Sequence, residues 1–155
     1  MNPEPAPDDT TRATRTARLA HLAHLVEEYR ALPSDSDRKR EIIAELDGNT
    51  AAQPFLVSVL ADAGEYDLAR VECATVLRLW PPADPDLRHR AGRALLAALN
   101  DPEEDLVRQY AAMALGPYAS DDPAVAEALI AAGKSGEDPL VLACARSALE
   151  EAGLA

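Results

Sequence analysis

Hydrophobic residues recur at spacings of three and four positions along most of the chain, which is the spacing of one face of an α-helix. The first such segment begins at Thr10 or Thr11, which can cap a helix, and ends at Pro33, which cannot continue one. Its apolar face consists of Leu19, Leu22, Leu25, Val26, Tyr29 and Leu32. A shorter helix is expected between Ser34 or Ser36 and Gly48, and the two would form a hairpin.

The same periodicity predicts six further helices, which would pair into three more hairpins. They cover residues 50–63, 67–80, 84–99, 105–115, 122–130 and 139–152. The apolar residues are mainly Ala, Leu and Val, whereas aromatic residues make up only 4% of the chain. Because Ala and Leu favour helices and strand-forming residues are scarce, the pattern predicts an all-α fold with no sheet.

One helical segment, residues 105–115, has copies elsewhere in the chain. Residues 67–77 match it at an offset of 38 positions, and residues 140–149 match it more loosely at an offset of 34. In the last copy Leu142 replaces an arginine, as a terminal repeat allows, because nothing stacks beyond it. A period of this length is typical of stacked helical hairpins. The repeated positions are Asp67 and Asp105, Arg70 and Arg108, and the closing Leu77, Leu115 and Leu149.

Two stretches resemble known repeat families. Residues 50–82, with Gly64, Ala69, Val76 and Pro81 at matching spacing, resemble a tetratricopeptide repeat. Residues 100–154, with a Val-Arg pair, paired alanines and a Leu-Gly end in their first half, resemble HEAT repeats. The resemblance implies a right-handed α-solenoid of about four antiparallel helical hairpins, which would bind a partner protein on its concave face. The two families line that face with different helices, so the resemblance leaves the binding face open.

The 155 residues are expected to form a single helical-repeat domain, residues 10–155. Residues 1–9 are rich in proline and acidic residues and are expected to be a disordered tail. This start has no basic or apolar region of the kind found in signal peptides, and no apolar run is long enough to cross a bilayer. The chain is therefore expected to be cytoplasmic.

The charge is strongly acidic, with 15 Lys and Arg against 27 Asp and Glu and a net charge of −12. Such a surface repels nucleic-acid phosphates and anionic lipids, so neither is expected as a partner. A basic protein partner is favoured, although an acidic excess also serves solubility alone.

The side chains that could carry chemistry each have a structural interpretation as well. His21 and His24, near Glu27 and Glu28, have a spacing that could hold a metal ion, but surface histidines, with His24 beside Glu28, are the preferred interpretation. Arg70 and Arg108 could bind an anion, but are expected to pair with neighbouring repeats. The acidic residues 101–105 lack the spacing of a calcium loop and suit a helix start.

Catalytic motifs are missing from the sequence. It contains no phosphate-binding glycine loop and no nucleophile elbow, and Cys73 and Cys144 are interpreted as reduced, buried thiols. We therefore expect no cofactor, no metal and no enzymatic activity. A HEAT-type lyase or a small-ligand enzyme stays an alternative, which would require a deep pocket containing perturbed titratable groups.

The leading hypothesis is a non-catalytic adaptor or scaffold that binds another protein. The side chains expected to contact the partner project away from the apolar faces of their helices: Glu72, Thr75, Arg78, Tyr110 and Met113. One alternative is an immunity or inhibitor protein that neutralises a basic partner. The chain is expected to be a monomer or a weak homodimer that pairs through the apolar face of its first helix.

Overall fold

The structure, a computed structural model, describes residues 9–134 and 138–155. Within these ranges the chain is all-helical and contains no strand, as the sequence predicts. The expected tail, residues 1–9, lies outside the described residues except for Asp9, the first residue of α1. The α-helices are α1 (Asp9–Ala31), α2 (Arg38–Glu45), α3 (Gln53–Ala61), α4 (Asp67–Leu79), α5 (Pro85–Leu99), α6 (Asp105–Ala114), α7 (Pro123–Ala132) and α8 (Pro139–Glu151), and two 3-10 helices are η1 (Thr50–Ala52) and η2 (Gly116–Tyr118).

Three helices begin with the same capping sequence, an aspartate followed by a proline. Asp84, Asp122 and Asp138 each accept a hydrogen bond from a backbone N–H of the first turn of α5, α7 or α8. The proline that follows has no N–H to leave unpaired, and its fixed φ suits the first helical position. These starts lie where the sequence places them.

The helix predicted for residues 50–63 is instead divided. Its first turn is η1, capped by the Asn49 side chain, which accepts a hydrogen bond from the Ala51 N–H. Pro54 lies in the first turn of α3, and its ring would clash with a carbonyl four residues earlier if the α-helix continued backwards. The proline therefore separates η1 from α3.

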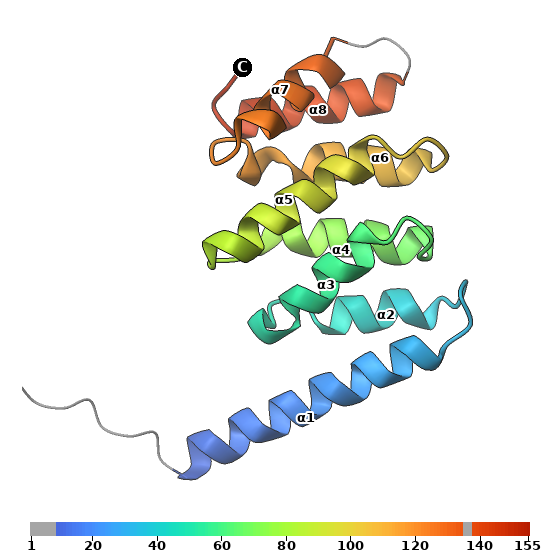
Figure 1. Cartoon of the computed structure of the whole chain (residues 1–155), viewed down its shortest axis with the longest axis vertical. Coiled ribbons are helices and arrows are strands. Elements are labelled where there is room, and N and C mark those ends of the chain that lie inside the picture. Colours follow the sequence, from blue (N-terminus) through green and yellow to red (C-terminus); the bar gives the residue numbers. More distant parts are fainter. Residues whose placement is uncertain (1–8, 135–137) are drawn as a thin grey trace, which may run out of the picture.

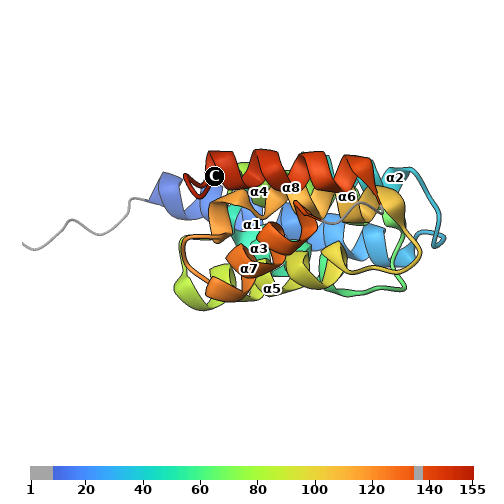
Figure 2. The ribbon, with the colours of Figure 1, turned by 90° about the horizontal axis from the view of Figure 1, so that it is seen from above.

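The helices form two layers, which Figures 1 and 2 show from the front and from above. One layer contains α2, α4, α6 and α8, and the other contains α3, α5 and α7. Within the first layer α4 packs on α2 and α6, and α6 packs on α8, while α3 packs on α5 and α5 on α7 in the second. The hairpins α1/α2, α3/α4, α5/α6 and α7/α8 thus follow one another along the long axis, with α1 and α8 at opposite ends.

The core between the layers is built from small and branched aliphatic side chains. Alanines at the helix crossings are fully buried and let the backbones approach closely. The closing leucines of the three repeat copies, Leu77, Leu115 and Leu149, are all buried. Fully buried alanines include Ala52, Ala69, Ala91, Ala98, Ala111, Ala112 and Ala145.

The first helix packs only along its second half. Leu25 and Tyr29 are buried, and the Tyr29 ring meets Phe55 edge to face at 5.2 Å between centroids. Leu19, predicted on the same packed face, is 50% exposed, and residues 10–21 are all exposed. The prediction fails there because the main contacts of α1 are with α2 and η1 only. The first half of α1 extends past the end of the stack (Figure 1).

Helical spacing would place Trp80 on the same face as Cys73 and Leu77, but the structure places it outside α4. The residue follows the last turn with φ −129° and ψ 69°, so it no longer has the helical phase of Cys73 and Leu77. Its ring lies half exposed against Gly48, whose φ of +75° ends the turn after α2 in the left-handed region that favours glycine.

Candidate partner-binding surface

Buried ion pairs join successive hairpins along one side of the stack. This loop side carries the loops that connect the two helices of each hairpin. Arg70 of α4 donates to the Asp101 carboxylate at 2.9 Å and to the Leu60 carbonyl at 3.2 Å. The Asp101 carboxylate also accepts the Glu103 and Glu104 backbone N–H groups, which begin the third hairpin's second helix. The Arg70 hydrogen bond lowers the pKa of Asp101, and both partners are almost fully buried. This pair therefore fastens the second hairpin to the third.

A similar pair joins the first hairpin to the second. Lys39 of α2 lies 2.6 Å from the Glu65 carboxylate, and its ammonium sits 4.9 Å from the centre of the Tyr29 ring. Burial works to raise the pKa of Glu65, but the Lys39 hydrogen bond, with lesser contacts, leaves that pKa below its ordinary value. Sequence reasoning missed Lys39, because a lysine next to charged residues on a short helix carries no sign of burial.

Arg108 occupies the repeat position of Arg70 but bonds mostly within its own hairpin. It donates to the Asp101 carbonyl at 2.6 Å and pairs with Asp105, three residues earlier. Asp138, at the start of α8, lies 4.0 Å away. Both arginines are thus engaged by protein groups, which leaves neither guanidinium positioned as a free anion site.

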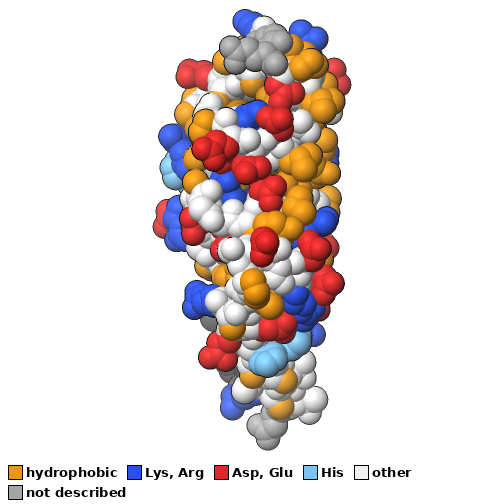
Figure 3. Space-filling model, turned by 90° about the vertical axis from the view of Figure 1, so that its right-hand side faces the viewer, with side chains coloured by type: hydrophobic (Ala, Val, Ile, Leu, Met, Phe, Trp, Pro, Cys, Tyr) orange, Lys and Arg blue, Asp and Glu red, His pale blue; other side chains and the backbone are white. Residues whose placement is uncertain are grey.

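Acidic side chains gather on this loop side of the stack, which faces the viewer in Figure 3. Glu104 has a pKa above its ordinary value, first because of partial burial and then because Asp67, Asp101 and Glu103 add negative charge nearby. α4 and the loop before α6 thus bring like charges together around Glu104, although Arg70 and Arg108 pair with Asp101 and Asp105 nearby. A basic partner would relieve this repulsion.

A shallow pocket of about 190 Å³ opens between α4 and α6. Four of the five residues predicted to contact a partner line it: Thr75 and Arg78 from α4, and Tyr110 and Met113 from α6. Thr75 and Met113 occupy equivalent positions of the repeat, 38 residues apart, so the stacking of α4 on α6 places them side by side. The structure therefore brings together residues that lie in two separate copies of the sequence pattern.

Glu72, the fifth predicted residue, is not among the residues lining this pocket. Its carboxylate pairs with Arg40 of α2 at 3.2 Å, so it serves the contact between the first two hairpins. Arg78 lines the pocket but also reaches Glu151 of α8 at 3.3 Å. Both charges are partly exposed and can exchange these partners for others.

Large apolar side chains are exposed on the layer of helices that contains the pocket. Leu79, beside Arg78, is 61% exposed, and Leu106 and Leu140 stand at equivalent repeat positions at the starts of α6 and α8. Figure 3 shows hydrophobic side chains in a column along the right-hand edge, on the side of the layer that contains α4, α6 and α8. The sequence analysis did not predict that these leucines would be exposed, although the alignment of the copies shows Leu106 and Leu140 at equivalent positions.

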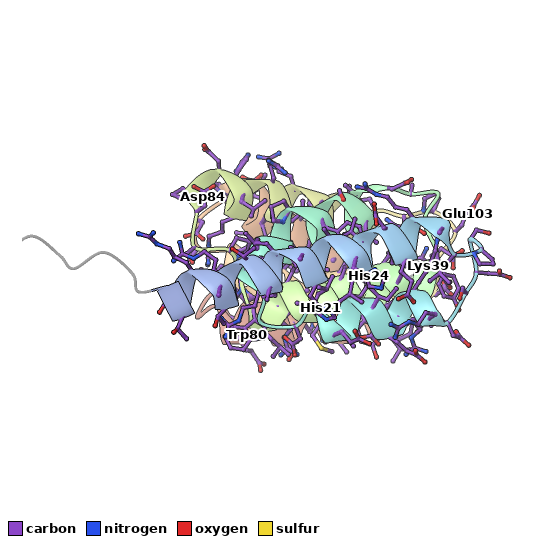
Figure 4. All side chains as sticks on the ribbon, turned by 90° about the horizontal axis from the view of Figure 1, so that it is seen from below. His21, His24, Lys39, Trp80, Asp84 and Glu103 are labelled. Atoms are coloured by element: carbon purple, nitrogen blue, oxygen red, sulfur yellow. The ribbon has the colours of Figure 1, made fainter. Side chains whose placement is uncertain are left out.

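The histidines do not assemble a metal site. His21 and His24 lie on the exposed side of α1 (Figure 4), and the described residues contain no group of three His, Cys, Asp or Glu that could hold a metal ion. The predicted pairing of His24 with Glu28 is also not the main one. Glu28 bonds Arg38 at 2.7 Å, and this hydrogen bond is the largest influence lowering its pKa, to which His24 adds only a weak charge effect.

A larger cavity of about 380 Å³ lies between α5 and the turn before α7. Its polar groups are joined to one another: Arg88 bonds Asp121 and the Pro117 carbonyl, and Arg93 bonds Asp122. The Tyr118 hydroxyl donates to the buried Leu77 carbonyl at 2.6 Å, and burial raises the pKa of that hydroxyl. These bonds join α5 to α4 and to the fourth hairpin, and His89, which also lines the cavity, lies 3.7 Å from Asp122.

The cysteines differ in depth, contrary to expectation. Both are free thiols, as predicted, but Cys73 is fully buried and Cys144 is only half buried. Burial raises the pKa of each thiol, most strongly for Cys73, so neither is activated as a thiolate.

Among the described residues no helix is both long and apolar enough to cross a membrane. Comparisons with models of protein families, with curated proteins and with solved structures yield no match to this chain.

Proposed function

We propose that this chain is a non-catalytic adaptor that binds another protein on the outer side of the layer formed by α4, α6 and α8. We propose further that its four hairpins belong to a right-handed α-solenoid of the HEAT or tetratricopeptide type. Support for the architecture comes from the order of packing, since each hairpin contacts the next along the long axis. Support for the repeat comes from the equivalent residues of α4 and α6.

One observation carries the binding proposal. Thr75, Arg78, Leu79, Tyr110 and Met113 line one pocket, and Leu106 and Leu140 add exposed apolar surface on the same layer of helices. A tyrosine and an arginine beside a shallow apolar pocket are the residue types that most often anchor protein interfaces. Large apolar side chains exposed on one layer of a protein are typical of surfaces that bind another protein.

The test replaces Tyr110 with Asp and measures which proteins cross-link to the chain in its native cell. Ile130→Asp on α7 is the matched control, because Tyr110 and Ile130 are each 40% exposed and lie in opposite layers. We expect the wild type and Ile130→Asp to retain a common set of partners and Tyr110→Asp to lose it. Equal recovery by all three chains would place the binding surface elsewhere.

A second candidate function is the neutralisation of a basic protein by the acidic loop side. The charge crowding around Glu104 supports it. Such binding would be fast and sensitive to salt, because attraction between opposite charges steers the encounter. The variant Glu103→Lys/Glu104→Lys should slow association with the captured partner, whereas Glu127→Lys/Glu150→Lys on α7 and α8 should change it little. Association rates that do not vary with ionic strength would remove this candidate.

A further inference from the structure

The exposed first half of α1 is the feature that neither the stack nor the proposed binding surface explains. Residues 10–21 are helical and exposed, and Leu19 at their end is half exposed. A helix gains most of its stability in a protein from packing its apolar face, and this half of α1 has no such packing within the part of its own chain that the structure describes. Figure 1 shows this half of α1 sloping away from the stack, and Figure 4, from below, shows α2 beside its second half.

The two halves of α1 carry opposite charge. Arg12, Arg15 and Arg18 lie in the first half, and residues 10–26 contain no Asp or Glu. With 15 basic and 27 acidic residues in all, the rest of the chain has 12 basic and 27 acidic residues, a net charge of −15. None of the ion pairs formed among the described residues includes Arg12, Arg15 or Arg18.

The second half of α1 lies beside an acidic cluster. Glu28, Glu41 and Glu45 all bond the single guanidinium of Arg38, at 2.7, 3.2 and 2.8 Å. Three carboxylates on one arginine leave an excess of two negative charges, and the exposed Glu27 and Arg30 lie one position before and two positions after Glu28 in α1. This cluster is formed by α1 and α2 together.

One copy cannot bring these charges together. Arg18 and Glu27 are nine residues apart, about 14 Å along a helix that rises 1.5 Å per residue, and Arg12 and Glu28 are about 24 Å apart. Helical neighbours pair only three or four residues apart. A second copy of α1 that runs in the opposite direction would, in contrast, lay each arginine half against the acidic cluster of the other.

An apolar strip lies where two such helices would meet. Leu19, Leu22 and Val26 alternate at spacings of three and four, and Arg12 and Arg15 continue the same line toward the start of the helix. Leu19 is half exposed, and Leu22 and Val26 are only partly covered by their own stack. A two-fold axis placed between Leu19 and Leu22 would set Leu19 of each copy opposite Leu22 of the other and Arg15 opposite Val26, so the strip is complementary to itself.

We propose that two copies of this chain associate through antiparallel α1 helices, with Arg12, Arg15 and Arg18 of each copy against Glu27 and the Glu28, Glu41 and Glu45 cluster of the other. This contact uses the end of the stack and is independent of the pocket between α4 and α6.

The test measures molecular mass by sedimentation across a concentration series. Arg15→Glu/Arg18→Glu should weaken self-association by about tenfold or more, because two-fold symmetry doubles the loss of each ion pair. Arg90→Glu/Lys134→Glu, on α5 and after α7, makes the same change in net charge and should associate like the wild type. Far-UV circular dichroism and thermal unfolding check that each variant keeps its fold.

A complementary variant makes the test selective. Glu27→Arg/Glu45→Arg should also fail to self-associate, yet an equimolar mixture with Arg15→Glu/Arg18→Glu should form a mixed dimer. The proposal is overturned if the wild type stays monomeric throughout, if the arginine variant associates as strongly as its control, or if the mixture stays monomeric. Tighter binding of the arginine variant to the wild type than of either chain to itself would indicate parallel helices and would overturn it as well.

Discussion

The links that join the second hairpin to the third and the third to the fourth begin from the same sequence pattern and end in different environments. Arg70 and Asp101 have side chains 3% and 7% exposed and meet at 2.9 Å. Arg108 and Asp138 are 22% and 26% exposed and stand 4.0 Å apart, and Arg108 has its nearest bonds inside its own hairpin. The same repeat position therefore forms a buried ion pair between the second and third hairpins and a solvent-accessible contact between the third and fourth.

The difference follows from what covers each arginine. Arg70 lies under the loop between α5 and α6, whose backbone N–H groups also bind Asp101 and hold that carboxylate in place. Arg108 lies near the last hairpin, where the stack ends and water has access. A buried charge that loses its partner is strongly destabilising, whereas an exposed pair contributes little, so the two links should respond very differently to mutation.

The largest effect is expected from Arg70→Met, which keeps much of the packing volume and removes the charge. Asp101 would then be buried without its cation, and the free energy of unfolding should fall by about 3–5 kcal/mol. Denaturant unfolding measures this, and Arg70→Met combined with Asp101→Asn should recover part of the loss. A decrease of less than about 1 kcal/mol would mean that water reaches this pair.

The next largest effect is expected from acid, which should weaken the ion pair between Arg70 and Asp101. Because the pKa of Asp101 is lowered in the folded state, its contribution is complete above the ordinary pKa of 3.8 and is lost as the pH falls from there through the folded value. Unfolding free energies measured between neutral and acidic pH should therefore decline more steeply for the wild type than for Asp101→Asn. Parallel curves would show that Asp101 does not titrate differently in the folded chain.

A smaller change is expected at the hydrated link. Arg108→Met should lower the free energy of unfolding by only about 0–1 kcal/mol, because its partners remain accessible to water. The same denaturant experiment as for Arg70→Met gives the comparison directly. If the two substitutions cost the same, burial is not what separates the links.

The smallest effect is that of salt. At about 1 M salt the screening length is about 3 Å, so the contribution of Arg108 should nearly vanish while that of Arg70 persists. The measurement is the difference between wild type and each methionine variant at low and high salt. A salt-dependent cost for Arg70→Met would contradict the dry environment inferred for it.

Much of the fold could be predicted from local features. Helix starts at Asp84, Asp122 and Asp138, the repeated positions of α4 and α6, and the small-residue core all depend on neighbours in the sequence. The candidate site could be predicted in part, because Tyr110 and Met113 project away from the apolar face of a periodic helix. Glu72 has the same local signature but pairs with Arg40 on another hairpin, and no local pattern encodes such a partner.

The all-helical composition, the start of each capped helix and the equivalence of the repeat copies can be predicted from the residues alone, because they follow from propensity, capping and periodicity within a few turns. The exposure of Leu19, the burial of Lys39 against Glu65 and the difference between Arg70 and Arg108 depend instead on how the hairpins pack. Burial depends on which other hairpin covers a side chain. That covering is a property of how the hairpins stack, and residues adjacent in the chain do not specify it.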